Sequence, residues 1–139
     1  MPKRFYVDTS VWRDFFEDRK DSIRPLGEFA FGFLKKCREE KLEVLVSDAV
    51  LFELKLRFSE AQLSHHFSSF EQIIRRIQAE PADILMAKRI LKEKKEPLPF
   101  NDVLHAVLAK KHGAVLVARD RHFELFLGWI EVKKPEELV

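Results

Sequence analysis

Three short apolar runs constrain the fold of this chain more than any other feature. They lie within residues 4–8, 43–47 and 114–118, with the cores FYV, VLV and AVLVA. A strand that is apolar on both faces must be buried on both, which is typical of a parallel sheet covered by helices. Between these runs, apolar residues recur at helical spacing. The alternation predicts an α/β fold, a three-layer α/β/α sandwich around a parallel sheet.

Helical periodicity predicts where the covering helices lie. We expect helices over residues 10–18, 26–40, 48–58, 60–79, 82–95 and 101–112, a helical turn at 121–126 and a last strand at 129–132. The helices at 60–79 and 82–95 would form a helical hairpin inserted between the second and third strands. The sequence contains no repeats and no linker, and 139 residues suffice for one core, so we expect a single domain over 1–139.

Composition and charge narrow the class of protein. Apolar residues make up 46% of the chain and charged residues 35%, which excludes a disordered chain. The formal net charge of +2 neither requires nor excludes nucleic acid. The single cysteine, Cys37, can form no internal disulfide, which fits a reducing cytoplasm. No apolar run approaches 18 residues, so we expect no membrane insertion, and we place the protein in the cytoplasm.

Four acidic residues lie where the predicted strands end or the neighbouring helices begin. Asp8 ends the first strand, and Asp120 follows the run at 114–118. Glu53 lies in the helix after the second strand, and Asp102 opens the helix before the third. Ligands of open parallel sheets bind beyond the carboxyl ends of the strands. Clustered carboxylates repel one another, and some take up protons unless a cation neutralises them. Oxygen ligands suit Mg²⁺ or Mn²⁺, so the sequence predicts such an ion at this edge.

Each acid also has a simpler structural explanation. Asp8 can be a buried carboxylate that accepts hydrogen bonds from the hydroxyls that follow it. Glu53 can pair with Arg57 one helical turn later. Asp102 and Asp120 can each complement the start of a helix. The convergence of all four acids favours the metal site over these separate roles.

Three segments carry a resemblance to a known family. The stretches YVDTSV, VSDAVLFEL and NDVLHAVLAKKHGAVLVARDRHFE resemble the PIN domain family, in particular the VapC-like toxin ribonucleases, and the likeness spans essentially the whole chain. The resemblance implies a Rossmann-like sandwich, cleavage of RNA with Mg²⁺ or Mn²⁺, an antitoxin partner and a homodimer. It also implies a metal-binding and catalytic quartet, which in this chain is Asp8, Glu53, Asp102 and Asp120. Thr9 or Ser10 stands where the family has a supporting hydroxyl.

The last motif departs from the family pattern. Similar proteins often read T-x-D-x-D there, whereas Ala118 takes the place of the threonine and His122 that of the second acid. Glu124 is the nearest carboxylate that could replace the lost one. Arg119 and Arg121 flank Asp120, and we expect them to hold RNA phosphates.

Metal-assisted cleavage of a phosphodiester needs few protein side chains. A metal held by Asp8, Asp102 and Asp120 can lower the pKa of a bound water and orient it towards a phosphodiester, with Glu53 as a further ligand or as the group that positions the water. His105 lies within the apolar helix DVLHAVLA, so we interpret it as a packing residue.

Two other functions fit parts of the pattern. A non-catalytic PIN-like module that binds RNA or a protein partner would keep the fold and tolerate the loss of the usual residues at 118 and 122. A phosphatase or receiver domain also has an aspartate after its first strand. The phosphatase, however, needs a second acid where this chain has Ser10.

Overall fold

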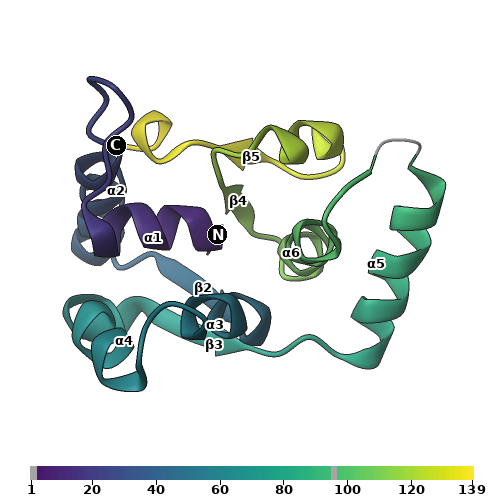
Figure 1. Cartoon of the computed structure of the whole chain (residues 1–139), viewed down its shortest axis with the longest axis horizontal. Helices are drawn as coiled ribbons and strands as arrows, with labels where there is room; N and C mark the ends of the chain where they lie inside the picture. The colour runs from purple at the N-terminus through teal and green to yellow at the C-terminus, as the bar shows by residue number, and fades with distance from the viewer. Residues whose placement is uncertain (1–2, 95–96) are drawn as a thin grey trace.

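A computed structural model of the chain describes residues 3–94 and 97–139 (Figure 1). The strands are β1 Arg4–Val7, β2 Glu43–Ser47, β3 Ile74–Ile77, β4 Val115–Val117 and β5 Val132–Lys133. The helices are α1 Thr9–Glu17, α2 Leu26–Glu40, α3 Asp48–Lys55, α4 Glu60–Phe67, α5 Pro81–Glu93 and α6 Phe100–Lys111. Three 3₁₀-helices complete the fold: η1 Ser68–Ile73, η2 Arg121–Phe126 and η3 Pro135–Glu137.

The five strands form one parallel sheet in the order β3-β2-β1-β4-β5. The central strand, β1, pairs with β2 on one side and with β4 on the other, so that Tyr6 lies opposite both Leu45 and Leu116. Because every neighbouring pair is parallel, the carboxyl ends of all the strands meet at one edge. The predicted α/β fold with a parallel sheet is confirmed.

Helices cover both faces of the sheet. Neighbouring residues of a strand point to opposite faces. On β1, Phe5 packs edge-on against Phe33 of α2, whereas Tyr6 packs against His105 of α6. The central strand is therefore buried between two helical layers, as its apolar sequence requires. Helix α5 stands at one side of the molecule and packs against α6 (Figure 1).

The predicted helix over 60–79 is wrong beyond its first half. Helix α4 ends at Phe67, η1 follows, and Ile74–Ile77 forms the edge strand β3. Isoleucine is β-branched and favours strands, and the open edge of β2 offers backbone partners to this segment. The helical hairpin between the second and third predicted strands is thus α4 and α5 with a strand between them.

Smaller differences concern the ends of elements. The last strand begins at Val132 rather than at residue 129. Helix α5 ends at Glu93, and Lys95, where we expected it to end, lies outside the described residues. None of the helices that the structure describes has the length and apolar character needed to cross a membrane.

Candidate metal centre

Asp8 is fixed at the carboxyl end of β1 by the start of the next helix. Its backbone N–H donates to the carbonyl of Val117 on β4, at 2.9 Å. Its carboxylate caps α1 by accepting from the backbone N–H of Ser10, at 3.3 Å, and from the Ser10 hydroxyl, at 2.6 Å. Only 5% of the residue is exposed. Burial raises the pKa of Asp8 above its usual value, although nearby His105 and the Ser10 hydroxyl oppose the shift.

Glu53 projects from α3 and receives two hydrogen bonds on one oxygen. Its Oε1 accepts from the Thr9 hydroxyl of α1, at 3.0 Å, and lies 2.7 Å from Nε2 of His105 on α6. Burial by itself would raise the pKa of Glu53, but the bonds from His105 and Thr9 outweigh it and lower the pKa. The carboxylate is therefore ionised and held by side chains from two neighbouring helices.

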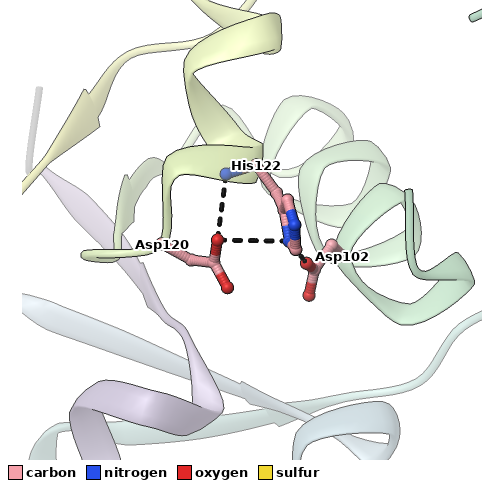
Figure 2. A group of neighbouring side chains, drawn as sticks. All are labelled: Asp102, Asp120 and His122. Carbon is pink, nitrogen blue, oxygen red and sulfur yellow. Dashed lines mark hydrogen bonds and ion pairs between the residues drawn. The ribbon is translucent and has the colours of Figure 1, made fainter. Parts of the chain in front are cut away.

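Asp102, Asp120 and His122 form a compact group at the same end of the sheet. Figure 2 shows the imidazole between the two carboxylates, with Nδ1 of His122 at 2.8 Å from Asp102 Oδ2 and 3.1 Å from Asp120 Oδ1. Asp120 also caps η2 by accepting from the backbone N–H of His122, at 2.9 Å. One ligand atom from each residue lies within 4.8 Å of the others, a spacing that can hold a metal ion.

Electrostatics connect this group to Asp8. The pKa of Asp102 is raised by burial and then by the charges of Asp8 and Asp120, while the hydrogen bond from His122 opposes the rise. The bond to Asp102 in turn raises the pKa of His122. Carboxylates that resist ionisation because of their neighbours are stabilised by a cation. The donors, mainly carboxylate oxygens with one imidazole, fit Mg²⁺ or Mn²⁺.

The four predicted acids thus lie at one edge but in two subsets. Asp102 and Asp120 share the group with His122, whereas Asp8 and Glu53 lie outside its 4.8 Å limit in the part of the chain that the structure describes. His105 lies between the two acids of the second subset, because its Nε2 is 2.7 Å from Glu53 Oε1 and 3.8 Å from Asp8 Oδ1. His105 lowers the pKa of both acids, and the charge of Glu53 raises the pKa of Asp8.

Three further predicted residues lie in different environments: Arg119, Arg121 and Glu124. The Arg119 guanidinium donates to both oxygens of Glu136, at 2.8 and 2.6 Å, and its Nε lies 3.4 Å from the buried Asp14. These ion pairs occupy Arg119 within the fold rather than at a phosphate. Arg121 and Glu124 are exposed on η2, and Glu124 does not belong to the group around His122.

His105 is the residue whose hydrogen bonds the sequence interpretation missed. It is fully buried, as a packing residue would be, yet both ring nitrogens lie within hydrogen-bonding distance of side chains. One signal was present in the sequence. His105 follows Asp102 by three residues on a helix, and residues at that spacing share a face.

Comparisons with known proteins agree with this architecture. The family model described as PIN domain matches residues 5–126. VapBC2 from Rickettsia felis, solved with a DNA fragment of its promoter, superposes with a TM-score of 0.71 at 15% identity over 94% of this chain and 98% of that one. DNA-bound VapBC from Salmonella typhimurium gives 0.71 at 18% identity over 97% and 99%. VapC20 from Mycobacterium tuberculosis, a Sarcin-Ricin loop cleaving toxin, gives 0.62 at 18% identity over 87% and 93%. Among curated protein sequences, none matches this chain.

Proposed function

The chain belongs to the PIN domain family, and from that premise we propose that it is a divalent-metal-dependent endoribonuclease, the toxin of a toxin–antitoxin pair. The observation that carries the proposal is the convergence of acids at the carboxyl edge of the sheet. Asp102 and Asp120 lie beside each other there, and the charge of Asp8 raises the pKa of Asp102. Isolated acids with purely structural roles would not need to interact in this way.

The proposed mechanism uses Mg²⁺ or Mn²⁺, which would be bound among four acids: Asp8, Glu53, Asp102 and Asp120. When bound, the ion would supply Lewis-acid activation of a water molecule. Glu53 would orient that water through Oε2, because the Thr9 and His105 donors both occupy Oε1. Ser10 would keep Asp8 in place by donating from both its hydroxyl and its backbone N–H.

RNA is the proposed substrate, and Arg121 is the proposed phosphate contact beside the acids. Arg121 is exposed and next to Asp120 in the chain. Arg119 is a weaker candidate than the sequence suggested because Glu136 and Asp14 already hold its guanidinium. An RNA substrate and a single buried cysteine both fit a cytoplasmic protein.

Protein partners are the second part of the proposal. Large apolar side chains are exposed at two helices: Phe52 on α3 and Leu56 at its C-cap, at 64% and 74%, and Leu85 and Met86 on α5, at 64% and 41%. Contiguous exposed apolar patches mark surfaces that bind proteins, and each of these two pairs places neighbouring apolar side chains on one surface. Toxin–antitoxin complexes are among the structures similar to this chain, which supports an antitoxin partner. We also propose a homodimer, and a strict monomer at micromolar concentration in sedimentation would exclude it.

A non-catalytic PIN-like module that binds RNA or a protein is the alternative. It is favoured by the two departures at the last motif, Ala118 and His122. The two functions differ in one measurable property. A nuclease cleaves RNA when metal is added and stops when EDTA removes it, whereas a binding module retains RNA without cleaving it.

Cleavage assays with Asp102→Asn and Asp120→Asn test the proposal. Each variant should lose metal-dependent cleavage while its circular dichroism spectrum stays that of the native fold, because only a charge is removed. Glu39→Gln on the exposed surface of α2 is the matched control and should cleave normally. Full cleavage by both aspartate variants, purified alongside an inactive mock preparation, would refute the proposed site.

A further inference from the structure

We propose that His105 and Tyr6 form a buried positioning relay that fixes Glu53 in the active site; this inference rests on the function proposed above. The relay consists of Ser47, Tyr6, His105 and Glu53, named in the order in which they are hydrogen-bonded. These residues come from β2, β1, α6 and α3. It thereby joins the central strand β1 and its neighbour β2 to the two helices that carry Glu53 and Asp102.

The distances along the relay are short at every step. The Tyr6 hydroxyl lies 2.6 Å from Ser47 Oγ and 2.6 Å from His105 Nδ1. His105 Nε2 lies 2.7 Å from Glu53 Oε1. Tyr6, Ser47 and His105 are all fully buried, so water does not compete for these bonds.

The direction of the hydrogen bonds follows from the chemistry of the two ends. An ionised carboxylate can only accept, so Nε2 of His105 must carry the hydrogen that it donates to Glu53. At the other end, Ser47 Oγ accepts from the backbone N–H of Val50, at 3.1 Å, and its own hydrogen is free to point at Tyr6. In the neutral ring, Nδ1 then accepts from the Tyr6 hydroxyl, and every hydrogen of the relay has an acceptor.

The relay determines which oxygen of Glu53 serves the site. Thr9 and His105 both donate to Oε1, which prevents the carboxylate from rotating and leaves Oε2 for an ion or a water molecule. His105 is in turn held at both ring nitrogens, so it cannot flip or swing away. His105 touches Glu53 but no reacting atom, which makes it a positioning residue.

A simple packing role does not account for this arrangement. Burying a polar ring among the apolar residues of α6 costs free energy unless its nitrogens are bonded. An aliphatic side chain would fill the space between β1 and α6 without needing Tyr6 and Ser47 as partners. The partners are present, and the chain of bonds ends on a carboxylate of the proposed catalytic quartet.

Two substitutions of His105 separate positioning from packing. His105→Leu fills similar space but has no donor, whereas the side-chain amide of His105→Gln can place a donor near the position of Nε2. Loss of a group that orients a metal-site carboxylate typically costs about 10- to 100-fold in activity or metal affinity. We expect that loss for His105→Leu in kcat or in Mn²⁺ affinity, an unchanged KM for RNA, and substantial recovery in His105→Gln. Tyr6→Phe should show a smaller loss in the same direction.

A core variant controls for lost stability. Ile73 is a buried residue that ends η1, just before the amino end of β3, whereas the metal centre lies at the carboxyl edge of the sheet. Ile73→Val should leave Mn²⁺ affinity and kcat unchanged. If His105→Leu matches the wild type, the relay does not position Glu53. If His105→Gln is as defective as His105→Leu, the ring's volume rather than its donor matters, and the proposal is equally overturned.

Measurements without RNA keep this inference separate from the proposed function. Nitrogen-15 NMR of labelled histidine should show a slowly exchanging hydrogen on Nε2 of His105, and Mn²⁺ titration should show weaker binding in His105→Leu. A hydrogen on Nδ1 with none on Nε2 would refute the relay even in an active nuclease. An inactive wild type that still shows the Nε2 hydrogen and the weaker Mn²⁺ binding would support the relay and refute only the nuclease function.

Discussion

Replacing Asp8 with asparagine should stabilise the metal-free protein at neutral pH. Burial raises the pKa of Asp8, and the neighbouring charge of Glu53 adds to the effect, while His105 and Ser10 oppose it. A carboxyl whose pKa is higher in the folded than in the unfolded state makes folding less favourable once it is ionised. The penalty is absent below the ordinary aspartate pKa, grows as the pH rises to the folded value, and is constant above it. Asp8→Asn should therefore raise the free energy of unfolding at pH 7 and leave it unchanged in acid.

The structure separates the charge of Asp8 from its second role. Its carboxylate caps α1 by accepting from Ser10, and asparagine is an equally good N-cap, whereas losing a cap to alanine costs about 1 kcal/mol. Asp8→Ala should thus be about 1 kcal/mol less stable than Asp8→Asn. Added metal should reverse the order of wild type and Asp8→Asn, because an ion at 100 times its Kd stabilises the folded state that binds it by about 2.7 kcal/mol.

Urea unfolding followed by the fluorescence of the buried Trp12 measures these differences. Each protein should be unfolded in EDTA and in saturating Mn²⁺, at pH 7 and in acid. A lower stability for Asp8→Asn than for the wild type in EDTA at pH 7 would refute the reasoning, since the buried charge would then carry no penalty. Equal stabilisation of both proteins by Mn²⁺ would remove Asp8 from the metal centre.

Three further predictions concern the residues around Asp120. A neutral imidazole is a poorer ligand than a carboxylate for Mg²⁺, and Mn²⁺ accepts an imidazole better than Mg²⁺ does. His122→Asp, alone or with Ala118→Thr, should therefore raise the Mg²⁺-supported rate and tighten binding of a second ion. Metal titrations that show no change would place His122 outside the coordination sphere. Arg119→Met should cost about 3 kcal/mol of unfolding free energy, the lower end for a broken buried ion pair, since Arg19 still lies 3.5 Å from Asp14. Arg121→Ala should change stability by less than about 0.5 kcal/mol and weaken RNA binding at low salt. If Arg121→Ala instead destabilised the fold and Arg119→Met weakened RNA binding, Arg119 would be the phosphate contact and Arg121 the structural residue.

The parts of the fold that the sequence predicted are those that depend on local pattern. The buried strands β1, β2 and β4 are apolar on both faces, and few structures other than a covered parallel sheet accommodate such a run. The edge strand β3 was missed because Ile73, Ile74 and Ile77 fit the spacing of a helix as well as that of a strand. What decides between the two is pairing with β2, about thirty residues earlier in the chain, and no local pattern records it.

Position in the sequence predicted the location of some site residues correctly and that of others incorrectly. Asp8 directly follows β1 and Asp120 comes soon after the end of β4 at Val117, so the topology carries both to the shared edge. Arg119 precedes Asp120 by one residue, yet neighbouring side chains of an extended backbone point to opposite sides. Its guanidinium accordingly reaches Asp14 and Glu136 instead of the metal centre.

His105 shows the reverse case, in which residues separated along the chain act together. A spacing of three residues on a helix places it on the same face as Asp102, and the parallel pairing of β2 and β1 brings Tyr6 to its other nitrogen and Ser47 to the Tyr6 hydroxyl. A residue next to an acid in the chain, such as Arg119, was thus not necessarily part of the site. Residues that share a face by helix or strand periodicity, such as His105 and Asp102, were. A buried polar residue one helical turn from a proposed catalytic carboxylate, inside an otherwise apolar helix, needs hydrogen-bond partners. In this chain its partner is Glu53, the one member of the predicted quartet that does not follow a strand or open a helix.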